Sequence, residues 1–243
     1  MPDLIRELSD GVLRKAWSAV VDDYAIAGGW AKGGNVLVVG DSAGGVTGFD
    51  GETGKSMWSC QQAHNGGLLT LAVDPSGGTF ATAGQDEHLR ICDAASGEAK
   101  REVNIDNGWV ENVAWSPNGK WLAASCSRQV RVFDTQGEEI WRSNDHPSTV
   151  STIAWSRSNE LATACYGQVV FMEGPTGKTR QILKWKGSLV SMALSPDGKV
   201  VACGSQDNSV HFWRRSRAKD SMMSGYSGKP SALAFDALSL IHI

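Results

Sequence analysis

The stretch LVSMALSPDGKVVACGSQDNSVHFW, residues 189–213, decides the fold because four earlier segments of the chain repeat its plan. Its alternating apolar residues end at the sequence SPDG, residues 195–198, where proline and glycine predict a tight turn. A second apolar run at 200–203 and a third at 210–213 follow, separated by a polar turn at 206–208. Three short strands joined by tight turns predict an antiparallel meander.

The third strand of this plan ends in an apolar or aromatic residue followed by a polar one, and successive pairs of this kind are 43, 41, 39 and 41 residues apart. That period is typical of the four-stranded blades of a β-propeller. We therefore expect an all-β chain with blades at about 17–60, 61–103, 104–143, 144–183 and 184–225, and the start of another at 226–237. The pairs are Phe49-Asp50, Cys92-Asp93, Phe133-Asp134, Met172-Glu173 and Trp213-Arg214.

Composition and charge narrow the class of protein. Of the 243 residues, 41% are hydrophobic, yet no run approaches the roughly 18 apolar residues that span a membrane. The net charge of -3 gives no general attraction to nucleic acid or anionic lipid. Arg214, Arg215, Arg217 and Lys219 form the one basic cluster, which we interpret as a solvated loop. The first residues lack the apolar centre of a secretory signal, so we expect a soluble, cytoplasmic protein.

The cysteines give no sign of a disulfide framework or of a metal site. Their odd number and the lack of any CxxC pair predict reduced, buried side chains. They are Cys60, Cys92, Cys126, Cys165 and Cys203. Trp30, Trp115 and Trp155 share one position in the first strands, and we expect all three in the core.

Several polar residues recur at corresponding places in the repeats. They resemble the hydrogen-bonded tetrad of His, Ser or Thr, Asp and Trp in WD-repeat β-propellers, and the chain resembles that family, in particular its bacterial members, over about residues 17–237. The resemblance implies that these side chains tie strands to turns, although Cys92 stands where the second repeat would have Trp. The matching residues are His64, Thr82 and Asp86 in the second repeat, His146 in the fourth, and Asp207 and Trp213 in the fifth.

The two ends of the chain bear on how the ring closes. In the resembling family an N-terminal strand usually completes the last blade, and residues 12–17 could form that strand. A sixth repeat begins at 231–236 and then breaks off, so we expect a C-terminally truncated chain that continues naturally to seven blades. Residues 238–243 are similar to the translation of a transposon-end sequencing adaptor, and we expect this tail not to be natural sequence.

No constellation of residues indicates catalysis or a cofactor. His64, His88, His146 and His211 lie in different repeats and lack nucleophile or metal-ligand spacing, so we expect no enzyme activity. An alternative comes from residues 50–58, which resemble the Asp-x-x-Thr-Gly-x-x-x-Trp docking motif of quinoprotein propellers. That resemblance implies a quinone-dependent propeller enzyme, although we interpret the motif here as a blade-docking turn. The alternative class to a scaffold is thus a quinone-dependent or hydrolytic propeller enzyme. A second alternative is that the chain is the binding part of a larger enzyme.

The loops before the first strands and after the second strands lie at one end of a propeller and are the positions from which it binds partners. Exposed aromatic side chains there would be anchors for a partner, because they bury a large area at low entropic cost. We therefore expect a non-catalytic scaffold that binds a protein or peptide, and no nucleic acid or membrane. The candidate contact residues are Trp109, His146, Tyr166, Trp185, Lys186 and Asp207.

Overall fold

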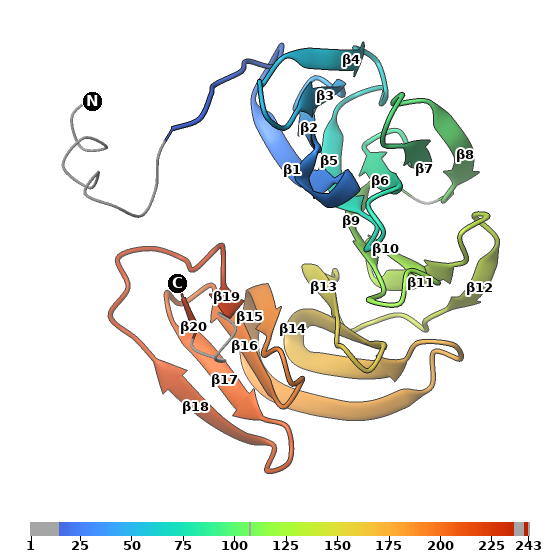
Figure 1. Ribbon diagram of the computed structural model, residues 1–243. Coiled ribbons are helices and arrows are strands. Elements are labelled where there is room, and N and C mark those ends of the chain that lie inside the picture. Colours follow the sequence, from blue (N-terminus) through green and yellow to red (C-terminus); the bar gives the residue numbers. More distant parts are fainter. Residues whose placement is uncertain (1–14, 107, 236–240, 243) are drawn as a thin grey trace.

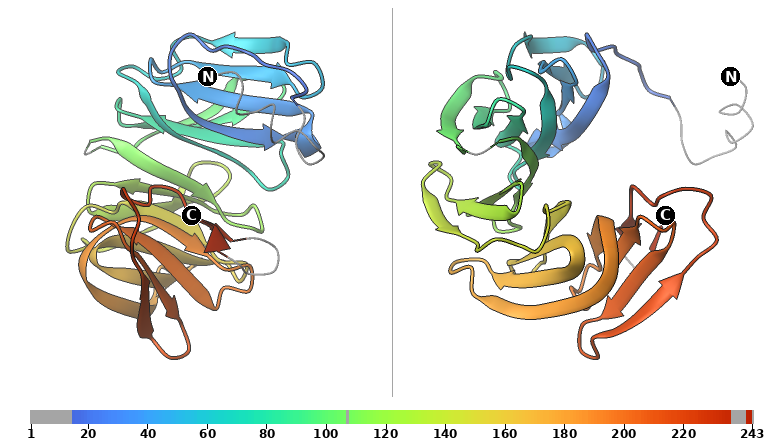
Figure 2. Two further views of the ribbon diagram at one scale, coloured as in Figure 1. Left: turned by 90° about the vertical axis from the view of Figure 1, so that its left-hand side faces the viewer. Right: turned by 180° about the vertical axis from the view of Figure 1, so that it is seen from behind.

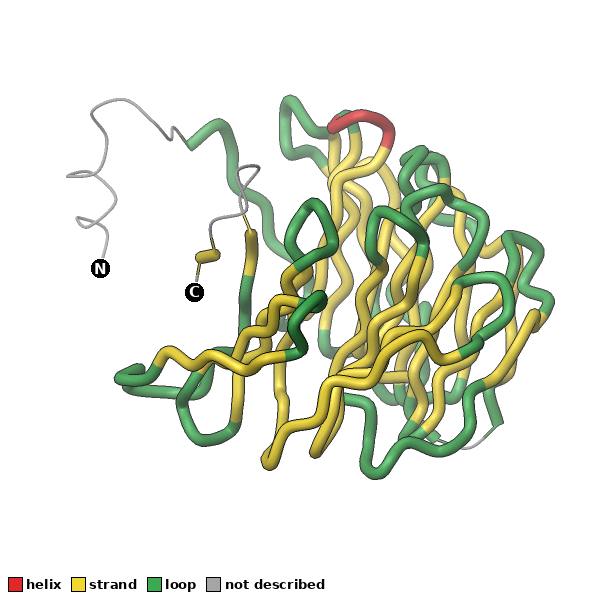
Figure 3. Tube along the Cα trace, turned by 90° about the horizontal axis from the view of Figure 1, so that it is seen from below, coloured by secondary structure: helices red, strands yellow, loops and turns green. Residues whose placement is uncertain are grey.

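The computed structural model describes residues 15–106, 108–235 and 241–242. They form an all-β molecule whose antiparallel sheets follow one another around an arc, with one edge of each sheet turned toward the axis (Figure 1). The predicted fold class of propeller blades is confirmed. Within the described ranges, the one helical segment is the short 3₁₀ turn Lys32–Gly34, drawn red in Figure 3. No helix in those ranges is long and apolar enough to cross a membrane.

The first three blades are separate four-stranded meanders in which each strand pairs with the next. Blade 1 consists of β1 (Ala25–Ala31), β2 (Val36–Asp41), β3 (Val46–Asp50) and β4 (Ser56–Cys60). Blade 2 consists of β5 (Leu68–Val73), β6 (Thr79–Gly84), β7 (His88–Asp93) and β8 (Ala99–Asn104). Blade 3 consists of β9 (Val110–Trp115), β10 (Leu122–Cys126), β11 (Gln129–Phe133) and β12 (Glu139–Arg142).

Blades 4 and 5 share a continuous strand and therefore form one six-stranded sheet. The first half of β14 pairs with β13, and its second half pairs with β15, so β14 supplies the second and third strands of blade 4. Likewise β15 runs from the outer strand of blade 4 into the inner strand of blade 5. The strands are β13 (Thr152–Trp155), β14 (Glu160–Glu173), β15 (Thr179–Leu194), β16 (Val200–Ser205), β17 (Val210–Arg214) and β18 (Lys219–Met223).

The turns between first and second strands explain why the SPDG pattern recurs. In blade 5 the Ser195 hydroxyl donates to Asp197 Oδ1 at 2.7 Å, and the same hydroxyl oxygen accepts the Val200 N–H at 2.9 Å. The fourth turn position needs a left-handed backbone, which glycine or asparagine adopts at least cost. That position holds Gly77, Gly119, Asn159 and Gly198, with φ between +60° and +70°.

The core lies between neighbouring blades. The inner strands pack side by side, β1 with β5, β5 with β9, β9 with β13, and β13 with β15. The outer strands β4, β8, β12 and β18 are mostly exposed, as expected for solvated sheet edges. Four of the cysteines are buried, but the prediction was wrong for Cys60, which is exposed because it ends the outer strand β4.

The three tryptophans at the shared first-strand position have different surroundings. Trp115 is buried, and Trp155 is half-buried and donates its indole N–H to the Ala114 carbonyl at 2.9 Å. Trp30 is 54% exposed, so the core prediction was wrong for this residue. The reason is its place in blade 1, whose far side carries no preceding blade in the described part and has only the Trp17 ring beside it.

The described parts of both ends lie near the open side of the arc, as the rear view in Figure 2 shows. Residues 12–14 of the expected closing strand lie outside the described residues, and Lys15–Trp17 has no strand structure. After blade 5, β19 (Ala234–Phe235) lies beside β15 and pairs with β20 (Ile241–His242). The rest of the expected adaptor-derived tail, residues 238–240 and 243, lies outside the described residues.

Candidate binding surface

The meander brings two kinds of connection to opposite ends of the blades, because consecutive strands run in opposite directions. We call one end the loop face; it carries the connections before the first strands and between the second and third strands. The other end, the turn face, carries the remaining turns, such as 74–78 and 134–138. The described loop-face segments in blades 2 to 5 are 61–67, 85–87, 105–106, 108–109, 127–128, 143–151, the bend at 166–167 within β14, and 206–209.

Two of the predicted contact residues present large aromatic surfaces on the loop face. Trp109 directly precedes β9 and is 55% exposed. Tyr166 lies where β14 turns back on itself, beside Gly167 at φ +85°, and is 53% exposed. Because no described neighbour covers most of either ring, both are available to a partner.

Trp185 and Lys186 lie within β15, although the sequence analysis expected them in a loop. The sequence between the outer strand of blade 4 and the inner strand of blade 5 has no proline and one glycine, so the chain stays extended. Lys186 is exposed, whereas Trp185 is half-buried and its ring centroid lies 4.0 Å from that of His211. Trp185 therefore contributes to the packing of blade 5 as well as to the surface.

His146 does not belong to the accessible surface, which corrects its prediction as a contact residue. It is 6% exposed, with Nε2 2.9 Å from Thr163 Oγ1 and Nδ1 3.0 Å from the Arg128 carbonyl oxygen. Burial lowers the pKa of its imidazole. The side chain ties the connection before β13 to the second strand of blade 4.

Asp207 is exposed on the loop face and organises its own turn. Its Oδ1 accepts the Ser209 N–H at 3.2 Å, and hydrogen bonds from the Ser209 side chain lower the pKa of its carboxyl group. The predicted partner in its tetrad, Trp213, is 1% exposed and belongs to the core between blades 4 and 5. Asp207 therefore bonds to Ser209 within its own turn, whereas Trp213 packs in the core, so the two residues have separate structural roles.

In blade 2 the structure brings the three predicted tetrad residues together. His64 Nδ1 lies 2.8 Å from Asp86 Oδ1, and Nε2 lies 2.9 Å from Thr82 Oγ1. Arg90, which the sequence analysis did not single out, adds an ion pair of 2.8 Å to Asp86. These contacts join the connection before β5 to the turn after β6, so they hold the loop face of blade 2 in shape.

A pocket of about 480 Å³ opens on the loop face. Its lining comes from three consecutive blades, so the pocket depends on their packing. Trp109 is the one predicted contact residue in the lining, and Glu111 follows it by two positions. The lining residues are Leu69, Trp109, Glu111, Asn112, Thr149 and Ser151.

Residues 50–58 form a docking turn between blades. Asp50 Oδ1 accepts hydrogen bonds from the Thr53 hydroxyl at 2.6 Å and from the Thr53 N–H at 2.8 Å, which close the turn and lower the pKa of the Asp50 carboxyl group. The Trp58 ring reaches blade 2, where it packs at Gly97 and stacks on Phe80 with centroids 5.7 Å apart. Trp58, the tryptophan of this motif, therefore packs blade 1 against blade 2.

The same contact recurs between other blades. Trp141 of blade 3 packs at Gly177 of blade 4 and donates its indole N–H to the Gly174 carbonyl at 2.6 Å. Trp17 does the same on blade 1, with its indole N–H 2.9 Å from the Gly51 carbonyl oxygen. In the described ranges no group of three or more His, Cys, Asp and Glu side chains gathers in the manner of a metal site.

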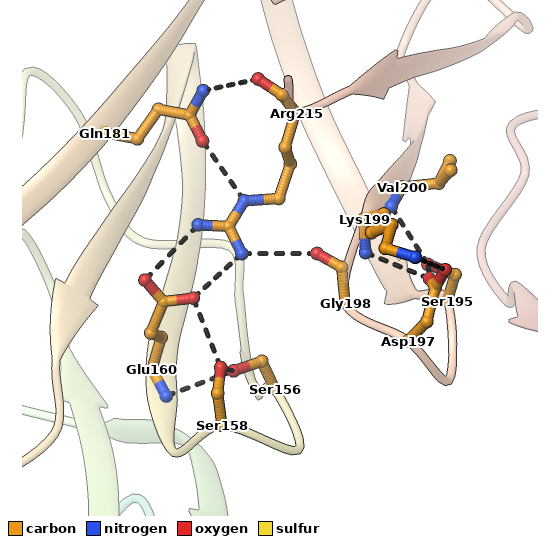
Figure 4. A network of polar contacts seen from close by, with 10 residues as sticks. All are labelled: Ser156, Ser158, Glu160, Gln181, Ser195, Asp197, Gly198, Lys199, Val200 and Arg215. Atoms are coloured by element: carbon orange, nitrogen blue, oxygen red, sulfur yellow. Dashed lines mark hydrogen bonds and ion pairs between the residues drawn. The ribbon is translucent and has the colours of Figure 1, made fainter.

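The basic cluster at 214–219 includes one residue that joins blades. Arg215 Nη1 lies 2.8 Å from Glu160 Oε2, and its Nε donates to Gln181 Oε1 at 3.1 Å (Figure 4). The guanidinium also lies 3.8 Å from the centre of the Phe171 ring. The interpretation of this cluster as a solvated loop was therefore wrong for Arg215. The other members, Arg214, Arg217 and Lys219, are exposed.

Comparison with known proteins agrees with the blade architecture. Residues 54–93, 101–134 and 177–214 match the family model described as WD domain, G-beta repeat. Each match ends at or directly after the end of a third strand, and it begins after the preceding third strand, in the second match within β8. The matched segments thus follow the repeat period.

Curated relatives include proteins of a yeast and of plants. The chain is 25% identical over 162 residues to Meiotic fizzy-related protein 1 of Schizosaccharomyces pombe, which covers 63% of this chain and 38% of that protein. It is 25% identical over 191 residues to WD repeat-containing protein slp1 of the same yeast, covering 74% of this chain and 39% of that protein. It is 28% identical over 149 residues to Cell division cycle 20.1, cofactor of APC complex, of Arabidopsis thaliana, and the match covers 55% of this chain and 31% of that protein.

These matches support a WD-repeat family for the chain. The chain spans less than two fifths of the length of each of these relatives. The expected likeness to bacterial members is not supported, because these relatives are eukaryotic.

Proposed function

We propose that this WD-repeat chain is a non-catalytic scaffold that binds a protein or peptide partner through its loop face. The observation that carries the proposal is the exposure of Trp109 and Tyr166, at 55% and 53%, on a frame whose loops are hydrogen-bonded in place. Exposed aromatic side chains on a rigid frame lose little entropy on binding and bury a large area. Trp109, Tyr166 and Lys186 form the proposed contact surface, with Trp185 and Asp207 at its margin.

The relatives lend this proposal support. One of them is named as a cofactor of the APC complex, and a cofactor of a complex acts through contact with other proteins. For the present chain we propose the same general mode, with a partner that is met in the cytoplasm. The two histidines that correspond to the tetrad, His64 and His146, are buried and hydrogen-bonded to strands and turns of the blades, which favours a structural role over catalysis.

Site-specific photo-crosslinking tests the proposal. Benzoylphenylalanine would replace Trp109 or Tyr166 on the loop face, and Gln136 on the turn face as a matched exposed control. In a lysate of the source organism we expect the same crosslinked protein from positions 109 and 166 and none from 136. Equal crosslinking from all three positions, or none from the two loop-face positions, would contradict the proposal.

A further inference from the structure

The loop-face pocket described above is lined mainly by polar side chains. Its side chains are one carboxylate, one amide, two hydroxyls, one indole and one leucine, and no Lys, Arg or His lines it. The volume of about 480 Å³ is large enough for a long side chain together with part of its backbone. The pocket lies on the surface proposed above to bind a partner, so its chemistry bears on what that partner carries.

Glu111 is a carboxylate without a counter-charge. Among the described residues, no ion pair or hydrogen bond reaches it, although it is half-buried. Burial accordingly raises the pKa of its carboxyl group above the ordinary value. A half-buried carboxylate of this kind gains most from a cation that also brings hydrogen-bond donors.

Further acceptors lie beside Glu111. The Asn112 amide N–H₂ donates to Ser125 Oγ at 2.8 Å and to the Val150 carbonyl at 3.5 Å. Its amide oxygen receives no hydrogen bond from the residues that the structure describes. The exposed Thr149 hydroxyl also faces the pocket. The pocket therefore offers several acceptors and needs donors.

Trp109 supplies an aromatic face next to these acceptors. Slightly more than half of the side chain is exposed, and no ring contact in the described part covers the indole. A cation over the face of tryptophan gains roughly 0.5 to 2 kcal/mol, depending on how far it is desolvated. The carboxylate and the indole thus favour the same kind of group.

We propose that this pocket binds the guanidinium group of an arginine in the partner protein. The inference rests on the proposed function, and it names the chemistry of the contact. A guanidinium is planar and can stack on Trp109, and its five N–H donors suit the acceptors of Glu111, Asn112 and Thr149. A lysine ammonium has three donors and no planar face, so it would satisfy fewer of these groups.

The test begins with a random dodecapeptide library displayed on phage and selected on the full chain. The selected peptides are synthesised with arginine and with citrulline, its uncharged isostere, and their affinities are measured by calorimetry. We expect arginine in the selected sequences and an affinity loss of about tenfold or more on the change to citrulline. Glu111→Gln and Trp109→Ala should each weaken the arginine peptide by a similar factor, and Trp109→Phe by less.

The control is Glu138→Gln, which removes an exposed carboxylate on the turn face and should leave the affinity unchanged. Circular dichroism checks that each variant is folded. Peptides that depend on Trp109 but bind equally well with citrulline would overturn the arginine inference and leave the scaffold proposal standing. If no selected peptide depends on Trp109 or Tyr166, both proposals fail.

Discussion

At the scale of single residues, opposing effects set the charge of the histidine in blade 2. The Asp86 carboxylate, 2.8 Å away, favours a protonated His64, but burial of the ring outweighs it and lowers the pKa of His64. Hydrogen bonds from His64 and Arg90 hold the pKa of Asp86 down at about 2, against the effect of burial. The native pair therefore combines a carboxylate with a neutral imidazole at neutral pH.

Both shifts make the chain less stable in acid. A group whose pKa is lower in the folded state stabilises the fold above its unfolded pKa, and this contribution is lost as the pH falls. The free energy of unfolding should thus decline below about pH 6.5, where unfolded His64 takes up a proton, and again between about pH 4 and pH 2, as Asp86 does. Asp86→Asn should make the second decline shallower, because other carboxyl groups with a lowered pKa, such as Asp74 and Asp93, remain, and it should cost about 2 kcal/mol at pH 7.

Urea denaturation of the wild type and Asp86→Asn at a series of pH values measures these contributions. Glu98→Gln, which removes an exposed carboxylate on the turn face, is the control and should follow the wild-type curve. An Asp86→Asn curve parallel to the wild type across the acid range would refute the account of this site.

At the residue scale, the repeat alignment is most informative where it contains every partner of a hydrogen-bonded group. His64, Thr82 and Asp86 come together because their spacing matches the strands that hold them. For His146 the aspartate is missing, and the Arg128 carbonyl oxygen takes its place. The repeat position of His146 indicated a structural role, but a backbone acceptor leaves no trace in the sequence, so this partner could not be predicted from the residue types.

At the scale of elements, one position on the outer strand decides how each blade docks on the next. Trp58 and Trp141 fill this position at the junctions of blades 1 and 2 and of blades 3 and 4. At the junction of blades 2 and 3 the position holds Arg101, which pairs in register with Ile91 as Trp58 does with Gly48. Arg101 donates to Gln136 Oε1 at 2.9 Å, and a groove of about 540 Å³ remains beside it.

Arg101→Trp should therefore stabilise the chain. An indole would fill the groove above Trp115, and cavity filling of this kind typically adds about 1 kcal/mol. The converse change, Trp141→Ala, should cost about 3 kcal/mol because it empties a filled junction. Both changes in the free energy of unfolding are measured from the shift of the urea midpoint, with the slope of the transition unchanged.

Arg101→Ala separates the gain of the indole from the loss of the arginine, and it should leave the stability nearly unchanged because this arginine is exposed. If Arg101→Trp is less stable than Arg101→Ala, the two junctions are not equivalent and the account of docking is wrong.

The junction of blades 4 and 5 uses polar contacts in place of an indole. Arg215 joins Glu160, Gln181 and the face of Phe171 across this junction. Arg215→Ala should cost about 2 kcal/mol, because it leaves Glu160 partly buried without its cation. Arg217→Ala, two positions on, removes an exposed arginine and should cost little.

Thermal unfolding of Arg215→Ala, Arg217→Ala, Glu160→Gln and the double variant Arg215→Ala/Glu160→Gln measures the stability contribution of this junction. If Arg215→Ala and Glu160→Gln were additive in the double variant, the ion pair would carry no coupling energy and the proposed junction would be refuted.

At the scale of the whole molecule, the repeat period predicted the blade architecture well. The polar residues that were taken to mark the third strands lie at or directly after the ends of β3, β7, β11, β14 and β17. The period could not predict how blades 4 and 5 join. Because no turn-forming sequence interrupts the chain near Gly187, β15 stays extended through both blades, and Trp185 lies in a strand and not in the predicted loop. The loop-face pocket was also unforeseen, because its lining comes from three blades and depends on their packing.

The central claim is that partners bind to the loop face, and hydrogen–deuterium exchange tests it most directly. The full chain would be measured free and saturated with a peptide from the library selection. We expect slower exchange in the loop-face segments 108–112, 149–151 and 166–168, and unchanged exchange in the turn-face segments 74–78 and 134–138. Protection of the turn-face segments, with the loop face unchanged, would contradict the claim.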